Sequence, residues 1–307
     1  MDLRVQKIIF NIKSLKIQGA RNVAKMAVHA LVVGVTTSKA KTTIQLEKEI
    51  KLLSKLISQS RPTEPMMRNM IVILLDTILF QIQRKEDISS IKKFVLQKED
   101  ILITEMENSL KRIAEYGAKL IPDDSLILTH CHSSSVTNIL RYAKRTGKEF
   151  EVICCETRPL FQGRITALEL AKAKIKTTLI VDGAVNLFMK KADIVLVGAD
   201  SVTSRGDLIN KVGTSTVAHI ARMHDVSFYS AAELLKYSSK TFFGEREEIE
   251  ERNPKEVLEK AMSGVSVRNP AFDVTASEYL RGYITEGGII PPQSFFSLAR
   301  EKLRVKF

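Results

Sequence analysis

The chain has 307 residues and a formal net charge of +12, and its 44% of hydrophobic side chains is ordinary for a soluble globular protein. The length allows a large core and predicts two domains. The three cysteines cannot all pair and two are adjacent, which argues against a disulfide framework. No charged start followed by a small-residue cleavage site is found, so we expect a cytoplasmic protein.

Most of the net positive charge lies in residues 1–120, where Lys and Arg outnumber Asp and Glu and are scattered rather than grouped in blocks. No RNA-binding signature with interleaved aromatic residues accompanies them, so nucleic acid is not the expected partner. A solvated helical surface is the simpler interpretation. An acidic partner or a phosphorylated substrate is the alternative.

Residues 1–120 are predicted to form a helical domain, because apolar side chains recur there at three- and four-residue spacing. The most apolar run, 70–82, is short and carries Asp76, which indicates a buried helix rather than a membrane span. Breaks between helices are expected at Gly19, at 36–43, at Arg61-Pro62 and at 85–89.

The hydrophobic pattern changes in residues 121–307, which are predicted to form a second domain. Short apolar runs alternate there with amphipathic helical windows, and the runs fall at 125–130, 150–156, 177–182, 193–200 and 226–232. Strands that are apolar throughout, each followed by a helix, indicate a parallel sheet covered on both faces. The predicted class is therefore α/β, with a helical domain followed by a doubly wound parallel sheet.

Polar residues end these predicted strands, namely Cys131, residues 156–158, Asp182 and Asp200. In open parallel sheets, ligands bind outside the carboxyl ends of the strands. We therefore expect these side chains to meet at one rim of the sheet.

Cys131 lies between His130 and His132, and a metal ligand, a buried structural thiol and a catalytic thiol are all possible. If the strand continues through this stretch, both histidines point away from Cys131, and no CxxC is present, so no metal is expected. A buried cysteine is the plainer alternative. However, Cys131 directly precedes a helix opened by serines 133–135, and a helix N-terminus lowers a thiol pKa from about 8.5, so that the thiolate can act as a base.

Asp200 is followed by a turn-rich stretch, 201–214, rather than by an immediate helix. Asn210 and Lys211 lie in this stretch, and the amides of residues 213–215 open the next helix, where an anion could bind. With Arg158, Arg164 and Lys236, they predict a phosphorylated ligand. Neither a GxGxxG fingerprint nor a Walker A loop is present, so a nicotinamide enzyme or a P-loop NTPase is not expected.

Six segments carry a family resemblance: THCHS (129–133), ETRPLFQGRITALELA (156–171), VGADSVTSRGDLINKVGT (197–214), AAELLKY (231–237), NPAFDVT (269–275) and ITEGGIIPP (284–292). They resemble the archaeal ribose-1,5-bisphosphate isomerases, which share a superfamily with 5-methylthioribose-1-phosphate isomerase and the alpha, beta and delta subunits of translation initiation factor 2B. The resemblance implies a helical domain followed by a Rossmann-like domain, in a dimer or a hexamer. It also implies that Cys131 is the proton acceptor and Asp200 the proton donor, with no metal or organic cofactor.

The same motif matching implies which residues contact the sugar phosphate. In the helical domain, the isomerases carry an Arg-Gly-Ala motif where this chain has Gln18, Gly19 and Ala20, and Arg21 could supply the missing charge from one helical turn away. The other implied contacts are Arg61, Ser133, Ser134, Ser135, Asn210, Lys211 and Lys236.

The leading hypothesis is an aldose–ketose isomerase that converts ribose 1,5-bisphosphate into ribulose 1,5-bisphosphate. One alternative is a non-catalytic regulatory subunit related to initiation factor 2B alpha, which would bind initiation factor 2 and is favoured by the Ile-Gln-Gly-Ala-Arg stretch at 17–21. The other is a methylthioribose-1-phosphate isomerase, which has the same chemistry on another substrate.

Overall fold

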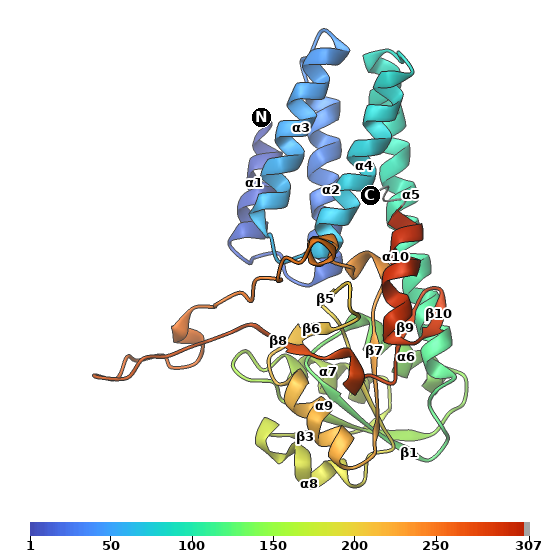
Figure 1. Cartoon of the computed structure of the whole chain (residues 1–307), viewed down its shortest axis with the longest axis vertical. Helices are drawn as coiled ribbons and strands as arrows, with labels where there is room; N and C mark the ends of the chain where they lie inside the picture. Colours follow the sequence, from blue (N-terminus) through green and yellow to red (C-terminus); the bar gives the residue numbers. More distant parts are fainter. Residues whose placement is uncertain (304–307) are drawn as a thin grey trace. The chain divides into compact units, whose positions relative to one another are not determined.

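The computed structural model describes residues 1–303, which divide into two compact units (Figure 1). One unit comprises Met1–Asn108 with Leu303, and the other Ser109–Lys302. The division falls inside a single long helix, α5 (Ile88–Ala118), rather than in a loop. The predicted domain limits, 1–120 and 121–307, stay a prediction.

The first unit is helical, as predicted. Its helices begin and end close to the predicted breaks, because local capping residues fix these points. Thr42 caps α3 by accepting a hydrogen bond from the Gln45 amide (3.2 Å), and Pro65 is the first residue of α4. The helices are α1 (Leu3–Lys13), α2 (Ala20–Thr37), α3 (Thr43–Ser60), α4 (Pro65–Gln83) and the first part of α5.

Helix α4 is long and apolar enough to cross a membrane by length and composition alone. Its apolar side chains, however, lie in the core of the helical unit, and each of the following is at most 1% exposed: Met66, Met67, Met70, Leu74 and Ile78. α4 is thus a core helix, as the sequence predicted.

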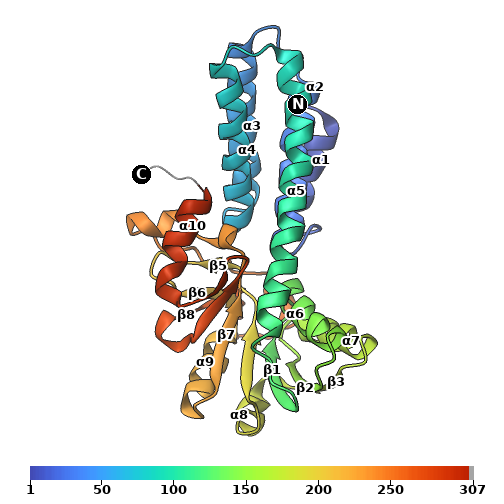
Figure 2. The same ribbon diagram turned by 90° about the vertical axis from the view of Figure 1, so that its right-hand side faces the viewer.

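The second unit contains a seven-stranded sheet, seen with its helices in Figure 2. Its order is β10-β9-β7-β4-β1-β2-β3, and all neighbours are parallel except β10 and β9. The parallel strands are thus arranged as in the Rossmann fold. The order in which successive strands are added to the sheet reverses between β1 and β4. The strands are β1 (Ser125–His130), β2 (Phe150–Cys155), β3 (Lys176–Ile180), β4 (Ile194–Val197), β7 (Ser227–Ala231), β9 (Gly282–Thr285) and β10 (Gly288–Ile290).

Helices alternate with these strands, as the periodicity predicted. The core contains Ile127 of β1, Val152 of β2 and Leu196 of β4 beneath Val136 and Ile139 of α6, all at most 1% exposed. The helices are α6 (Ser134–Arg145), α7 (Gln162–Lys172), α8 (Val185–Met189), α9 (Thr214–Met223) and α10 (Phe295–Leu303). The 3₁₀ turns are η1 (Asp182–Ala184), η2 (Leu234–Lys236), η3 (Ser239–Phe243), η4 (Pro254–Glu256), η5 (Ser277–Tyr279) and η6 (Pro292–Ser294).

Two features differ from the sequence prediction. The turn-rich stretch after Asp200 forms an antiparallel sheet of β5 (Ser201–Val202), β6 (Leu208–Lys211) and β8 (Phe272–Thr275), whose strands are too short for a periodic signal. The run 177–182 was expected to be buried on both faces. It forms the edge strand β3 instead, where Leu179 is 45% exposed and Val181, just after it, is 60% exposed.

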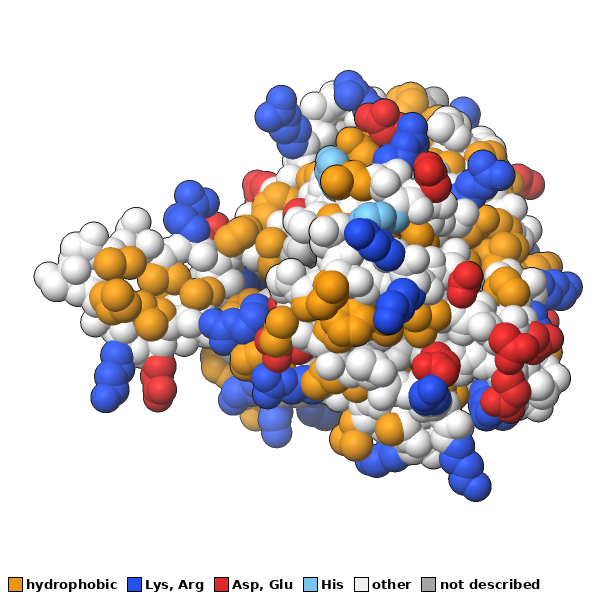
Figure 3. Space-filling view, turned by 90° about the horizontal axis from the view of Figure 1, so that it is seen from below, with side chains coloured by type: hydrophobic (Ala, Val, Ile, Leu, Met, Phe, Trp, Pro, Cys, Tyr) orange, Lys and Arg blue, Asp and Glu red, His pale blue; other side chains and the backbone are white. Residues whose placement is uncertain are grey.

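Charged side chains of both signs are interspersed on the face of the molecule shown in Figure 3. No continuous basic surface is seen on this face.

Candidate active site

The candidate site lies at the carboxyl ends of the parallel strands, which are level with one another. His130 pairs with Cys155, and Cys155 in turn with Ile180, so β1, β2 and β3 end together. Cys131 directly follows β1, and Asp200 lies three residues after β4. These two strands flank the point at which the strand order reverses, where ligands bind in this fold. The predicted rim is confirmed.

Cys131 has a left-handed backbone, with φ of 70°. Its amide donates a hydrogen bond to the Thr157 hydroxyl (2.9 Å), and its carbonyl accepts one from the Thr166 hydroxyl (2.9 Å). The strand therefore stops at His130. The condition for both histidines to point away from Cys131, a strand that continues through this stretch, is not met, because Cys131 leaves the extended conformation.

The pKa of the Cys131 thiol is raised to about 12, chiefly by burial. The positive charge of Lys211 and the amide of His132 lower this pKa, whereas the negative charges of Asp200 and Asp182 raise it. The predicted lowering of this pKa by the neighbouring helix is therefore wrong, because desolvation of the thiolate outweighs the helix dipole.

The segment that carries Asp200 is packed against the start of α6. A Cβ on Gly198 would lie 2.6 Å from the Cβ of Ser133, so only glycine fits at this position. The Asp200 amide donates to the carbonyl of Ile209 in β6 (3.0 Å). The two predicted acid–base residues, Cys131 and Asp200, are thus on adjoining segments.

Lys236, Asn210 and Lys211 lie around the Asp200 segment. The buried Lys236 ammonium donates to the carbonyl of Ala199, the residue before Asp200 (2.7 Å). The buried Asn210 amide donates to the Thr214 hydroxyl (3.0 Å), and Lys211 places its charge close enough to lower the pKa of Cys131. The structure therefore brings these three predicted residues to the same rim.

The serines open α6 beside Cys131. Ser133 is the N-cap and its hydroxyl accepts from the amide of Val136, while Ser134 and Ser135 form the first turn. The Ser135 hydroxyl is buried and has no hydrogen-bond partner among the described residues. A bound ligand could satisfy it.

Arg158 follows β2, but its side chain is used within the unit. Its guanidinium donates to the Val257 carbonyl (2.9 Å) and lies 5.2 Å from the centroid of the Phe161 ring. Its amide donates to the Asp182 carboxylate (2.7 Å). A phosphate contact from Arg158 therefore stays a prediction.

The anion site predicted at the start of α9 is occupied by the chain's own carboxylate. The amides of Gly213 and Ser215 donate to Asp273 at 2.7 and 3.1 Å. Burial raises the pKa of Asp273 to about 6, while these amides and the charge of His219 lower it. The prediction of an open anion site is wrong here, because β8 brings Asp273 from far along the chain.

Three predicted residues lie at the start of α2, in the helical unit. Gln18 is exposed, and its side-chain amide donates to the carbonyl of Leu15 (2.9 Å). Gly19 has φ of 81° and is the N-cap of the helix, and Ala20 is its buried first residue. Their part in phosphate binding stays a prediction.

Two predicted arginines of the helical unit are buried. Arg21 donates to the carbonyl of Met106 (3.1 Å), and its guanidinium lies 3.5 Å from the Glu107 carboxylate. Arg61 forms an ion pair with Glu64 (3.2 Å). Arg21 thus packs its guanidinium onto α5, and its proposed compensation for Gln18 stays a prediction.

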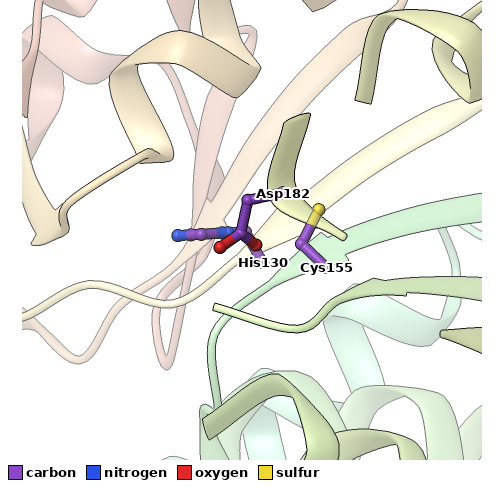
Figure 4. Close-up of side chains that lie close together, drawn as sticks. All are labelled: His130, Cys155 and Asp182. Atoms are coloured by element: carbon purple, nitrogen blue, oxygen red, sulfur yellow. The ribbon is translucent and has the colours of Figure 1, made fainter. Parts of the chain in front are cut away.

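His130, Cys155 and Asp182 form a cluster in which a metal-ligating atom of each lies within 4.8 Å of the others (Figure 4). The Nε2 atom of His130 lies 3.0 Å from the Val212 carbonyl, and its Nδ1 atom is buried with no hydrogen-bond partner in the described part of the chain. Burial raises the pKa of the Cys155 thiol. The cluster could hold a cation such as Zn²⁺ only after that thiol ionises, so the expectation of no metal stays a prediction.

The sequence did not single out Thr166 or Asp273. Thr166 lies 35 residues from Cys131, and Asp273 lies 60 residues from Gly213. Both residues lie within segments that carry the family resemblance, 156–171 and 269–275, but their contacts could not be predicted from these segments, because only the folded chain creates them. The strand-end position of Thr157 was the single available sign, and its contact with Cys131 was not foreseen.

The chain belongs to the initiation factor 2 subunit family, whose model matches residues 16–292. It is 39% identical to the ribose 1,5-bisphosphate isomerase of Pyrococcus furiosus, over 97% of this chain and 94% of its relative. It is 33% identical to the methylthioribose-1-phosphate isomerase of Desulforamulus reducens, over 94% and 88% of the two chains. A solved structure of the translation initiation factor eIF-2B of Pyrococcus horikoshii has a TM-score of 0.79 and 30% identity, over 95% of this chain and 98% of that one. The family resemblance is thus confirmed, and both sequence relatives are sugar-phosphate isomerases.

Proposed function

We propose that this chain is a sugar-phosphate isomerase that converts ribose 1,5-bisphosphate into ribulose 1,5-bisphosphate. The observation that carries the proposal is the position of Cys131 and Asp200 after β1 and β4, the two strands that flank the reversal of strand order. The relative from Pyrococcus furiosus, 39% identical, is named for this substrate.

The chemistry needs one base and one acid. The phosphate on C1 blocks spontaneous ring opening, so the enzyme must break the bond between C1 and the ring oxygen. The Cys131 thiolate removes the C2 proton while Asp200 gives its proton to the ring oxygen, which leaves an enol across C1 and C2. The thiol then returns its proton to C1 and the C2 hydroxyl loses its proton to Asp200. The product is the ketone, and both residues regain their starting states.

The high pKa of the Cys131 thiol suits this scheme if the pair shares one proton. The negative charge of Asp200 raises the pKa of Cys131, so protonating Asp200 removes one of the effects that disfavour the thiolate. The active form of the pair is thus the thiolate beside a protonated carboxyl group. A thiolate in a desolvated site is also a strong base, which helps it to remove a proton from carbon.

The start of α6 is proposed to hold a phosphate of the substrate. Ser133, Ser134 and Ser135 present hydroxyl groups and backbone amides there, and the helix dipole favours an anion. Lys211 and Lys236 add positive charge from the Asp200 side. The phosphate contacts that the resemblance implies for Arg61 and the turn of Gln18 stay part of the proposal.

A turnover assay tests the proposal. Purified protein is given ribose 1,5-bisphosphate, methylthioribose 1-phosphate or 5-deoxyribose 1-phosphate, and the ketose is measured. We expect conversion of ribose 1,5-bisphosphate with the highest kcat/KM. Preferred conversion of methylthioribose 1-phosphate would keep the mechanism but replace the substrate. No conversion of any sugar, together with tight binding to initiation factor 2, would establish the regulatory alternative instead.

The assembly and the location are also proposed. The family resemblance suggests a homo-oligomer, either a dimer or a hexamer, in the cytoplasm. Light scattering on the purified protein distinguishes these assemblies from a monomer.

A further inference from the structure

We propose that Thr157 and Thr166 form a threonine clamp, which holds the two peptide groups of Cys131 so that the sulfur keeps the direction that proton transfer requires. The proposal rests on the proposed function, in which Cys131 is the base. Both threonines are positioning residues that act through Cys131.

The backbone of Cys131 needs such a clamp because its φ of 70° is unfavourable for a residue with a side chain. A left-handed conformation is unfavourable for a residue other than glycine, because its Cβ comes too close to the following carbonyl oxygen. Such a conformation persists only where the surroundings enforce it. The surroundings here are the two hydroxyl groups.

Thr157 holds the amide of Cys131. Its side chain is fully buried, and its hydroxyl lies 2.9 Å from the Cys131 nitrogen and 3.1 Å from the Cys155 carbonyl. A hydroxyl group has a single proton, which must go to the Cys155 carbonyl. Its lone pair therefore faces the Cys131 amide, which is the correct polarity for a hydrogen bond.

Asp182 fixes Thr157 in turn. Thr157 also has a left-handed backbone, with φ of 64°. One carboxylate oxygen of Asp182 accepts from the Thr157 amide (2.8 Å), and the other from the Arg158 amide (2.7 Å). A chain of contacts thus runs from the end of β3, through the end of β2, to Cys131 at the end of β1.

Thr166 holds the carbonyl of Cys131 from helix α7. Its hydroxyl donates to this carbonyl (2.9 Å) and lies 3.0 Å from Nδ1 of His132. Since its only proton is already used, Nδ1 of His132 must carry the donated proton. Gly163 lets α7 approach, because a Cβ there would lie 1.7 Å from the Cys155 carbonyl oxygen.

The clamp predicts a defect in the chemical step rather than in substrate binding. Neither threonine is assigned to the substrate, so its loss should leave KM nearly unchanged. A base that is displaced by about 1 Å can lose about 10²-fold in rate. We therefore expect kcat to fall by about 10- to 100-fold when either hydroxyl is replaced by a methyl group.

The experiment compares Thr157→Val and Thr166→Val, which keep the shape, with Thr157→Ser and Thr166→Ser, which keep the hydroxyl. Thr177→Val is the control, because the Thr177 hydroxyl bonds only the Ile175 carbonyl among the described residues. Two quantities are measured: kcat and KM, and the rate at which iodoacetamide alkylates Cys131, read on the labelled peptide by mass spectrometry. The second readout does not depend on turnover.

We expect the valine variants to lose kcat with KM within about threefold of the parent, and to alkylate several-fold faster as Cys131 relaxes out of its left-handed conformation. The serine variants and Thr177→Val should resemble the parent in both measurements. Valine variants with parental kcat and parental alkylation would overturn the clamp, and so would serine variants as impaired as the valine ones. If Thr157→Val does not fold, Thr166→Val decides by the same two criteria. A parent without turnover refutes the proposed function, while the alkylation rates still decide the clamp.

Discussion

Ser133 and Gly198 are in contact so close that a Cβ on Gly198 would lie 2.6 Å from the Cβ of Ser133. The contact joins the first turn of α6 to the segment that leads from β4 to Asp200. It therefore connects the segment of the proposed base with the segment of the proposed acid.

Gly198→Ala should destabilise the protein by about 1–3 kcal/mol, because an added methyl group must displace Ser133 in a tightly packed region. Urea unfolding measures the change. Gly183→Ala is the control, since a Cβ there meets nothing within 4 Å, and it should stay within about 0.5 kcal/mol of the parent. Adding Ser133→Gly should recover part of the loss. Equal stability of the two alanine variants would contradict the close contact.

Cys131→Ser and Asp200→Asn should each lower turnover by about 10²-fold or more. A serine hydroxyl hardly ionises, and an asparagine has no proton to transfer. Both variants should still bind sugar phosphate within about tenfold of the parent by calorimetry, because neither residue is assigned to phosphate binding. The double variant should be little worse than the singles, since the two groups act in one reaction. Full activity in either single variant removes that residue from the mechanism.

Asp200→Asn should also make Cys131 more reactive. The negative charge of Asp200 raises the pKa of the Cys131 thiol, so its removal lowers that pKa and increases the thiolate fraction at any fixed pH. Iodoacetamide labelling between pH 7 and 10 should therefore be faster in the variant. Asp207→Asn serves as the control, because Asp207 is not among the charges that shift this pKa. Slower or unchanged labelling in Asp200→Asn would show that the two groups do not share a proton.

Gln18→Arg should preserve turnover and lower KM for ribose 1,5-bisphosphate, because arginine can bind a phosphate through two hydrogen bonds. The exposed position of Gln18 leaves room for the longer side chain. Gln6→Arg adds the same charge on the exposed surface of α1 and should leave KM unchanged. An unchanged KM in the Gln18→Arg variant would mean that this turn does not contact phosphate.

Asp273 should make stability depend on pH. Burial raises its pKa from the ordinary value of 3.8 to about 6, so the folded chain binds this proton more tightly than the unfolded chain. The contribution of Asp273 to the free energy of unfolding is therefore lost as the pH rises from about 4 to above 6. The stability of the parent minus that of Asp273→Asn should fall by about 2 kcal/mol between pH 4.5 and pH 7.5. Urea unfolding at both pH values measures this difference, and a constant difference would contradict the raised pKa.

The sequence was informative wherever a short segment decides the structure. The start of α4 follows from Pro65, and the strand β1 from an apolar run of suitable length. The conformation of Cys131 was beyond reach, because the residues that enforce it lie 26 and 35 positions away. The predicted direction of the Cys131 pKa shift was wrong for the same reason. The helix start can be predicted from the sequence, whereas the desolvation of the thiol depends on the whole fold.

The carboxylate of Asp273 at the start of α9 has a consequence for selectivity. A helix N-terminus whose amides already bind a carboxylate of the chain does not bind the phosphate groups of other metabolites. Asp273→Ala would expose the amides of Gly213 and Ser215. This would create a second phosphate-binding site next to the segment that contains Lys211. Inorganic phosphate would then become a stronger inhibitor, because it could occupy the rim without resembling the sugar. The built-in anion thus leaves the start of α6 as the proposed place for the substrate phosphate.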